Sequence, residues 1–329
     1  MKFQWNKKHI RLIAILLFII FVLFLPLDSF FKTLNIETHF LYEDYKGLQI
    51  DNRNFSSKVS SQIRLDDIFF SIKTSGHTEQ RMDFLILTWL QRTIKTTTIV
   101  SDHSSLALKL RTNYRVKDTD CKSDHSPDGL VCKMAAEFET YLNKASAWWC
   151  HFDDDMYVNT NVLLSVLRKF DSDNEDIYIG RTSLKKPLVV VYKGKSSTFW
   201  FAHGGCGFCV SRKLAMKMKP FIVNSSFETL NNQIKINDDC LIGFVINYIL
   251  KVDLIQSNLF NSHYKTELKR FSLENLRKQV TLSYNKNNRV EINDNINTTY
   301  FNVKDDPSRF YTIHCMLYPT TNYCQRMLH

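Results

Sequence analysis

Residues 147–158 read AWWCHFDDDMYV, an aromatic and apolar run that ends in three consecutive aspartates. A run of this kind is typical of a buried strand. Like charges side by side repel, and near a core they are costly unless a positive group joins them. The stretch therefore predicts a buried strand whose carboxyl end carries a site for a positive partner.

Strand-like and helix-like stretches alternate around this segment. Strands are expected at 67–75, 96–102, 146–152, 176–180 and 187–194, and helices at 79–92, 132–145, 161–170, 212–221 and 238–250. Such alternation indicates an α/β fold with an open, mostly parallel sheet and helices on both faces. Ligands bind at the carboxyl ends of the strands in such sheets. That location favours a site at the aspartates over a solvated turn, the ordinary alternative for Asp.

The N-terminal segment has the pattern of a membrane signal-anchor. No residue from Leu12 to Leu27 is polar or charged, and the basic residues all precede this run: Lys2, Lys7, Lys8 and Arg11. A spanning helix needs about 20 mostly apolar residues, and the basic flank stays in the cytoplasm. The alternative is a cleaved signal peptide, but no small-x-small cleavage site directly follows the run.

The expected organisation has four parts, with the whole polypeptide after the anchor in the lumen of the secretory route. They are a cytoplasmic tail at 1–11, a transmembrane signal-anchor at 12–31, a stem at 32–65 and a lumenal catalytic domain at 66–329. Eight cysteines, an even number, suit an oxidising compartment. Three N-glycosylation acceptors at Asn54, Asn224 and Asn297 agree with it.

The overall charge and the glycines narrow the class of ligand. The net charge is +10, yet the cations form no single long arm, so nucleic acid is not an expected partner. Adjacent carboxylates on a tight turn suit Mg²⁺ or Mn²⁺, which can bind a diphosphate. The glycine cluster Gly204–Gly207 lacks the Lys-Ser/Thr of a phosphate-binding P-loop. These features favour a nucleotide-sugar donor over a nucleoside triphosphatase.

Five segments resemble the Fringe family of β1,3-N-acetylglucosaminyltransferases, which extend O-linked fucose. They are HFDDDMYVN (151–159), FAHGGCGFCVSR (201–212), NDDCLIGFVI (237–246), LFNSHYK (259–265) and DPSRFYTIHCMLYP (306–319). The first two contain elements shared with the wider β1,3-glycosyltransferase superfamily, whereas the C-terminal segment is particular to Fringe. The resemblance extends from about Asp67 to Cys324. It implies a GT-A-like fold and a single-pass type II protein of the Golgi membrane.

The resemblance also implies roles for five residues. Asp155 and His263 would ligate Mn²⁺, with Mg²⁺ as the alternative, and Asp154 and Arg81 would bind the donor. Asp239 would be the general base. The implied reaction is inverting transfer of N-acetylglucosamine from UDP-GlcNAc to the 3-hydroxyl of O-linked fucose on EGF-like repeats of Notch-type receptors. Taken alone, His263 would be a packing or surface residue and Arg81 an exposed helix cation, and Asp238 and Asp239 would cap the following helix.

Two other functions stay open on the sequence. One is a sister β1,3-glycosyltransferase such as a galactosyltransferase, and the other is a non-catalytic lumenal binding protein. The chain departs from the Fringe pattern at His203, Cys206 and Asn261, which affects the expected donor fit and acceptor choice. The segment between Lys73 and Arg81 is one residue shorter than in the family.

The family pattern also implies how the cysteines pair. It joins Cys121 to Cys132, Cys150 to Cys209, and Cys315 to Cys324. The second bridge would tie the aspartate strand to the glycine segment. Cys206 and Cys240 are then expected as two buried thiols. The alternative is a bridge between them, which requires Cα atoms within about 7 Å.

Overall fold

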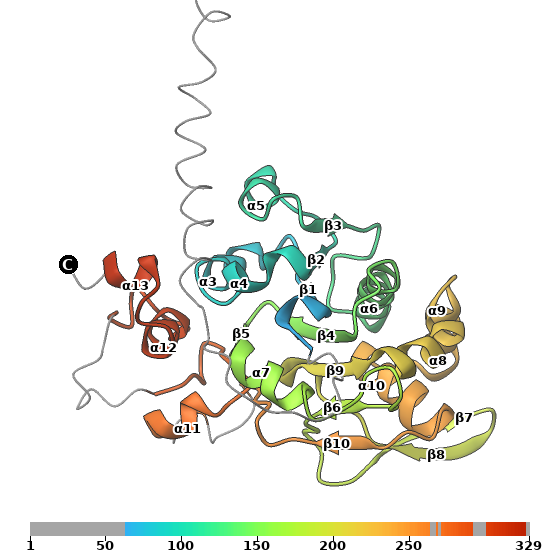
Figure 1. Cartoon of the computed structure of the whole chain (residues 1–329). Helices are drawn as coiled ribbons and strands as arrows, with labels where there is room; N and C mark the ends of the chain where they lie inside the picture. Colours follow the sequence, from blue (N-terminus) through green and yellow to red (C-terminus); the bar gives the residue numbers. More distant parts are fainter. Residues whose placement is uncertain (1–62, 264–267, 269–270, 292–300, 327–329) are drawn as a thin grey trace, which may run out of the picture. The chain divides into compact units, whose positions relative to one another are not determined.

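The computed structural model describes residues 63–263, 268, 271–291 and 301–326 (Figure 1). The predicted cytoplasmic tail and signal-anchor, the stem up to residue 62, Asn54 and Asn297 lie outside these residues. No helix within the described ranges has the length and apolar character needed to cross a membrane. Asn224 is exposed in the turn between two helices, as a glycosylation acceptor requires.

A seven-stranded sheet forms the centre of the described fold, with the strand order β10-β6-β9-β4-β1-β2-β3. All of its neighbouring strands are parallel except where β9 pairs antiparallel with β4 and β6. The predicted mostly parallel α/β sheet is therefore confirmed. Its strands are β1 (Ile68–Lys73), β2 (Thr97–Ser101), β3 (Val116–Asp118), β4 (Trp148–Asp153), β6 (Tyr178–Gly180), β9 (Phe208–Ser211) and β10 (Leu254–Gln256).

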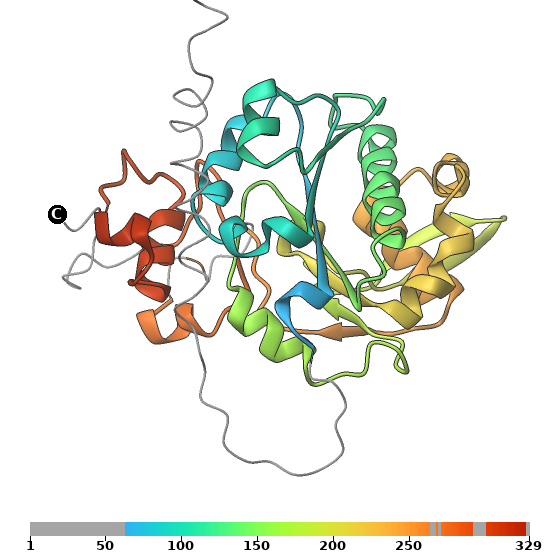
Figure 2. The ribbon, with the colours of Figure 1, turned by 45° about the horizontal axis from the view of Figure 1, so that its top comes forward.

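Helices cover both faces of this sheet, as predicted (Figures 1 and 2). Alternate side chains of a strand point to opposite faces, so β1 sends Phe70 into one core cluster and Phe69 into the other. The Phe70 cluster takes in α3 (Met82–Ile86), α4 (Leu90–Thr93), α7 (Thr160–Leu167), α11 (Leu273–Arg277) and α12 (Phe310–Leu317). The Phe69 cluster takes in α6 (Pro127–Leu142), α8 (Arg212–Ile222), α9 (Ser226–Ile234) and α10 (Asp238–Gly243).

Smaller elements complete the described chain. Two further helices are α5 (Leu106–Arg111) and α13 (Asn322–Arg326). β5 (Met156–Val158) pairs antiparallel with β11 (Thr281–Ser283), and β7 (Leu188–Tyr192) pairs antiparallel with β8 (Lys195–Phe199). The first pair brings the C-terminal third of the chain beside the aspartates, because β5 begins directly after them.

Two expected helices differ in detail from the structure. The stretch 79–92 is broken into a 3₁₀ turn at Glu79–Arg81 followed by α3 and α4, and the Thr88 hydroxyl bonds the Phe84 carbonyl near the break. Such a side-chain bond to the backbone competes with regular helix. The stretch 238–250 starts as α10 but continues as a π-helical segment, Phe244–Ile249.

The three predicted disulfides are all present. Cys150 and Cys209 face each other across β4 and β9, so this bridge links the aspartate strand to the glycine segment as expected. Cys206 and Cys240 are not joined to each other, and both carry thiols. Cys206 is buried, whereas Cys240 is only half-buried, which corrects the expectation that both are buried.

Candidate active site

The site lies at the carboxyl ends of β1 and β4, the edge at which a parallel sheet binds ligands. The two strands run in register, so that their last residues, Lys73 and Asp153, are paired. Lys73 Nζ lies 3.3 Å from Asp153 Oδ1. Asp154 and Asp155 follow in the turn before β5. The positive partner that the first aspartate requires is thus a lysine from the neighbouring strand.

Asp154 is buried and is held on both of its oxygens. The hydroxyls of Thr74 and Thr78 donate to Oδ2 at 2.7 and 2.5 Å, and Arg81 donates to Oδ1 at 3.1 Å. Arg81 also lies 3.8 Å from Asp155 Oδ2. The structure thus brings Arg81 together with both predicted aspartates. In the structure, the Asp154 carboxylate holds the Arg81 guanidinium in place. A contact of Asp154 with the donor stays a prediction.

Asp155 lies beside His263, as the metal prediction requires. The Ser283 hydroxyl donates to Asp155 Oδ1 at 3.2 Å and lies 3.0 Å from His263 Nδ1. His263 Nδ1 is 3.5 Å from Asp155 Oδ2. Ser283 ends β11, whose pairing with β5 carries it to this position.

The chemistry of this pair fits a divalent cation. Burial, followed by the charges of Asp153 and Asp154, raises the pKa of Asp155 well above its usual range, and a cation would offset that repulsion. Burial lowers the pKa of His263, which favours the neutral imidazole that metals bind. Within the described ranges no three His, Cys, Asp or Glu side chains gather as a metal-binding group. From this part of the chain, Asp155 and His263 would thus supply one carboxylate and one imidazole.

Asp239 is held by backbone groups. Its Oδ2 accepts from the Gly204 N–H at 2.8 Å, and its Oδ1 accepts from the Cys240 N–H at 2.7 Å. Removal from water, followed by the charge of Asp238, raises the pKa of this carboxyl. The N-cap position of α10 belongs to Asn237, so Asp239 is not the helix cap. A half-buried carboxylate with a raised pKa is suited to accept a proton.

Lys73 connects the two parts of the site. Its Nζ binds Asp238 Oδ2 at 2.5 Å in addition to Asp153. One ammonium group therefore joins the first aspartate of the triplet to the residue before Asp239. Against the opposing effect of burial, this lysine also holds the pKa of Asp153 well below its usual range.

A buried polar chain continues beneath Asp153. His151 Nε2 lies 3.5 Å from Asp153 Oδ1, and His151 Nδ1 lies 2.7 Å from Glu137 Oε2. The Ser71 hydroxyl donates to the same Glu137 oxygen at 2.5 Å. Against burial, the charge of Glu137 raises the pKa of His151 to about 9. These buried side chains hold Asp153, and with it the start of the aspartate turn, in a fixed position.

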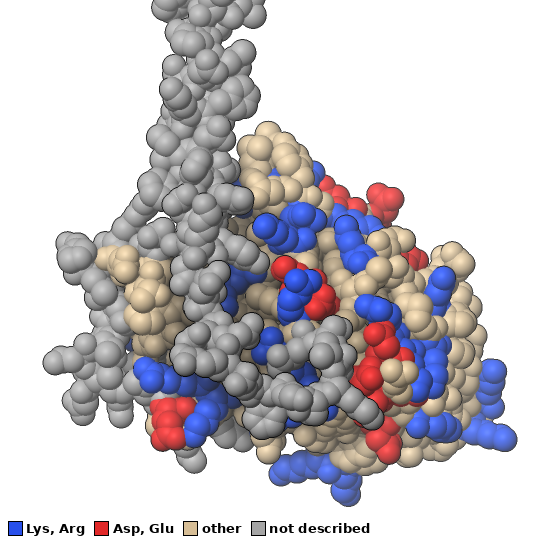
Figure 3. All heavy atoms as spheres, in the orientation of Figure 1, with Lys and Arg blue, Asp and Glu red and all other residues tan. Residues whose placement is uncertain are grey.

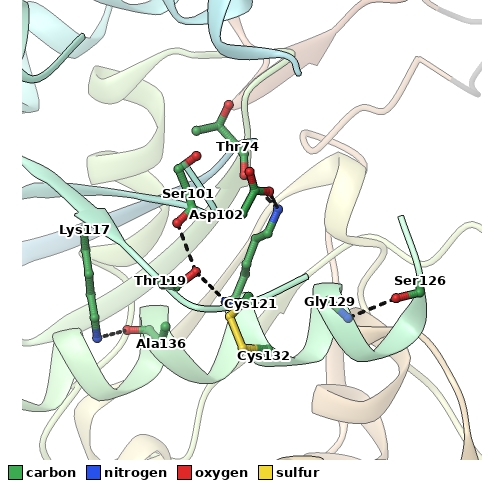
Figure 4. The surroundings of a disulfide bond; sticks show 11 residues. Thr74, Ser101, Asp102, Lys117, Thr119, Cys121, Ser126, Gly129, Cys132 and Ala136 are labelled. Carbon is green, nitrogen blue, oxygen red and sulfur yellow. Dashed lines mark hydrogen bonds and ion pairs between the residues drawn. A yellow bond between two sulfur atoms is a disulfide. The ribbon is translucent and has the colours of Figure 1, made fainter. Parts of the chain in front are cut away.

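The Cys121–Cys132 disulfide joins α6 to the loop that precedes it, near the aspartate turn (Figure 4). Lys133, next to Cys132, forms a buried ion pair with Asp102 and donates to the Thr74 carbonyl at 3.2 Å. Thr74 in turn donates to Asp154. The bridge therefore anchors the helix that positions one of the groups holding the second aspartate.

The glycine segment 204–207 fits closely against the aspartate strand. Gly207 has a φ of +74°, and a Cβ on it would lie 2.6 Å from Phe152 Cδ1. Only glycine meets both conditions. This turn places the Gly204 N–H on Asp239.

Comparison with known proteins identifies the family. A family model described as Fringe-like matches residues 63–321, which is most of the chain. The chain belongs to the Fringe-like family. It is an enzyme of the glycosyltransferase class, as the resemblance predicted.

The curated relatives of this Fringe-like chain are named β-1,3-N-acetylglucosaminyltransferases. Lunatic fringe of Danio rerio is 38% identical over 275 residues, covering 80% of this chain and 72% of the relative. Manic fringe of Danio rerio is 40% identical over 272 residues, covering 80% and 73%. A mannosyltransferase of Pyrobaculum calidifontis, solved with GDP-Man and Mn²⁺, has a TM-score of 0.36 and 9% identity over 80% of this chain and 73% of its own. That likeness is too low to carry an argument.

The departures from the Fringe pattern lie around the site of this family member. Asn261 is buried and accepts from Arg181 Nη1 at 3.0 Å, while its own amide donates to Gln279 at 2.9 Å. His203 directly precedes Gly204, whose N–H donates to Asp239. Asn261 is therefore two residues from the predicted ligand His263, and His203 is next to the glycine that contacts the predicted base Asp239.

Several residues of the site were not predicted from the sequence. They are Lys73, Thr74, Thr78, Glu137, His151, Asp238 as a lysine partner, Gly204 and Ser283. Lys73 ends an expected strand, so the strand-end rule that singled out the aspartates also applies to it. The others contact the site through the fold and leave no comparable local signal.

Proposed function

We propose that the chain transfers N-acetylglucosamine from UDP-GlcNAc to the 3-hydroxyl of O-linked fucose on EGF-like repeats of Notch-type receptors. The observation that carries this proposal is the Lys73 ammonium, which lies 3.3 Å from Asp153 and 2.5 Å from Asp238. Lys73 thus links the two sides of the site. The donor side contains Arg81, Asp154 and Asp155, and the base side contains Asp239.

The proposed reaction is a single displacement with inversion. The fucose 3-hydroxyl oxygen bonds to the anomeric carbon as the bond from that carbon to the β-phosphate oxygen breaks. Asp239 takes the hydroxyl proton, and UDP departs with the electron pair. The raised pKa of Asp239 makes its carboxylate a stronger base than an ordinary aspartate. Its two backbone N–H partners fix its orientation.

The donor side would bind and neutralise the nucleotide. Arg81, held by Asp154, presents a fixed cation for the UDP phosphates. Asp155 and His263 would hold Mn²⁺ or Mg²⁺, which when bound stabilises negative charge on the departing diphosphate. Thr74 and Thr78 keep Asp154 oriented toward Arg81.

A donor and acceptor assay tests the proposal. The purified full chain is incubated with UDP-GlcNAc, UDP-galactose or UDP-GalNAc and a fucosylated EGF repeat, with the unfucosylated repeat as the control. We expect transfer from UDP-GlcNAc alone, only to the fucosylated repeat, and a β1,3 linkage by NMR. Preference for UDP-galactose would identify a sister transferase. Binding of UDP without transfer from any donor would favour the non-catalytic alternative.

We also propose that the chain is a type II Golgi membrane protein, anchored by residues 12–31 and held off the bilayer by the stem at 32–65. The sequence pattern of these segments supports the topology. In cells, wild-type chain should be glycosylated at the exposed Asn224, and Asn224→Gln should remove that glycan. An Asn224 that stays unmodified in microsomes, with the catalytic part sensitive to external protease, would contradict the topology.

A further inference from the structure

The β7–β8 hairpin, residues 188–199, has one face packed on the protein and one face exposed. Leu188, Val190 and Tyr192 pack against the Phe69 cluster, and Tyr192 contacts Phe244 at 5.1 Å between ring centroids. The alternate residues, Val189 and Val191, point the other way and are 58% and 67% exposed. Two strands with one covered face and one apolar, uncovered face are suited to pack against something else.

The outer face of the hairpin combines short polar and apolar side chains. The cross-strand partner of Val189 is Thr198 and that of Val191 is Ser196, both exposed. Leu184, just before the hairpin strands, is 37% exposed. The paired valine, threonine and serine side chains of this face are short, so burying them costs little conformational entropy.

The hairpin and the loop before it are also strongly basic. Residues 181–200 contain one arginine and four lysines and no Asp or Glu. The lysines are all exposed: Lys185, Lys186, Lys193 and Lys195. Among the described residues, none of these four lysines has an acidic group within ion-pair distance; Lys193 Nζ instead lies over the Tyr192 ring at 5.1 Å. Blue side chains stand out at the tip of the hairpin and on the loop that precedes it (Figure 3). Uncompensated cations of this kind attract an acidic partner.

Both ends of the hairpin are joined to the base side of the site. At its start, the Arg181 carbonyl accepts from the His203 N–H at 2.9 Å, and Arg181 Nη1 donates to Asn261 at 3.0 Å. At its end, the chain continues from Phe199 through residues 200–203 to Gly204, whose N–H donates to Asp239. The hairpin therefore extends from the side of the site that carries Asp239, so a polypeptide bound at that side can continue onto the hairpin.

We infer that the open face of the β7–β8 hairpin is a docking surface for the acceptor polypeptide, and that it takes an acidic stretch of that polypeptide outside the fucosylated residue. The inference rests on the proposed transferase function and adds to it how the enzyme selects a protein rather than a free sugar. The valines supply apolar contact area, and the four lysines supply attraction and register.

The test compares a protein acceptor with a small one. Lys185, Lys186, Lys193 and Lys195 are changed together to Glu in the full chain, and a second variant carries Val189→Thr and Val191→Thr, which keep the side-chain shape and β-propensity. With the fucosylated EGF repeat we expect KM to rise about tenfold or more in the lysine variant and a few-fold in the valine variant. With a soluble fucoside, kcat and KM should stay within about twofold of wild type.

A matched control distinguishes the loss of a docking surface from the effect of a changed net charge. The same four-charge change is made at exposed lysines elsewhere, namely Lys144, Lys169, Lys219 and Lys304. This variant should keep the wild-type KM for the protein acceptor. Added salt should raise the KM of wild type and of the control, but not that of the hairpin variant.

The outcomes are distinguishable. Wild-type chain that transfers to neither acceptor contradicts the proposed function itself. Wild-type transfer with an equal change, or none, for both acceptors in the hairpin variants overturns the docking surface. Loss of binding to phosphatidylserine vesicles without any change in the acceptor KM also overturns it, because the surface would then bind a membrane.

Discussion

The two sides of the site hold their aspartates in different ways. Asp154 has two hydroxyls and a guanidinium on its oxygens, and Asp155 has Arg81, Ser283 and His263 around it. Asp239 instead accepts two backbone N–H groups at 2.7 and 2.8 Å. Burial raises the pKa of a carboxyl on both sides, Asp155 on one and Asp239 on the other. The difference lies in what orients the carboxylates: charged and hydroxyl side chains from distant elements on the donor side, and backbone N–H groups on the base side.

Metal removal is the most severe test of the donor side. EDTA should reduce transfer below detection, and Mn²⁺ should restore it, because Asp155 and His263 would lose the cation that neutralises the diphosphate. The measurement is transfer from UDP-GlcNAc to the fucosylated repeat. Full activity in EDTA would remove the metal role and leave Arg81 as the cation that the described residues place beside Asp155.

Asp239→Asn tests the base side with almost no change in shape. An amide cannot take up the acceptor proton, so kcat should fall by about 10²-fold or more. The variant should fold and bind UDP as wild type does, which calorimetry can measure. Near-normal turnover would show that Asp239 has only a structural role, and the contrast between the two sides would disappear.

Arg81→Met keeps the length of the side chain and removes its charge. Because Arg81 lies 3.1 Å from Asp154 and 3.8 Å from Asp155, its loss should weaken UDP-GlcNAc binding. Arg81 is partly exposed, so we expect a moderate effect, a rise in KM for the donor of about tenfold. Arg81→Lys should recover part of the affinity, and KM for the acceptor should stay unchanged. A change in acceptor KM alone would place Arg81 on the wrong side.

Asp238→Asn should shift the pH dependence of transfer. Burial and then the Asp238 charge raise the pKa of Asp239, and a base works only when deprotonated. In wild type, kcat/KM should therefore fall as the pH drops through a value above the usual aspartate range. Removing the neighbouring charge lowers that value, so the acid limb should move to lower pH. An unmoved limb would assign it to a different group.

Local sequence patterns were enough for the general fold and for the position of the site at the end of the aspartate strand. The apolar run before Asp153 to Asp155 predicted a buried strand with a site at its end, and alternating segments predicted a mostly parallel sheet. The resemblance to Fringe supplied Arg81, Asp239 and His263; the structure places Arg81 and His263 beside Asp155, and the roles of all three stay predictions. The three disulfide pairings were also predicted from the family resemblance and not from the spacing of the cysteines, and all three are present.

The partners of those residues depend on contacts between distant parts of the chain. Lys73 meets Asp238, 165 residues later, only because β1 lies beside β4 and α10 packs against the same end of the sheet. Glu137 reaches His151 from α6, and Ser283 reaches Asp155 through the pairing of β11 with β5. A sequence pattern records which residues are apolar or charged along one element. Which charges share a buried space is decided by how the elements pack, because burial away from water is what makes a charge require a partner.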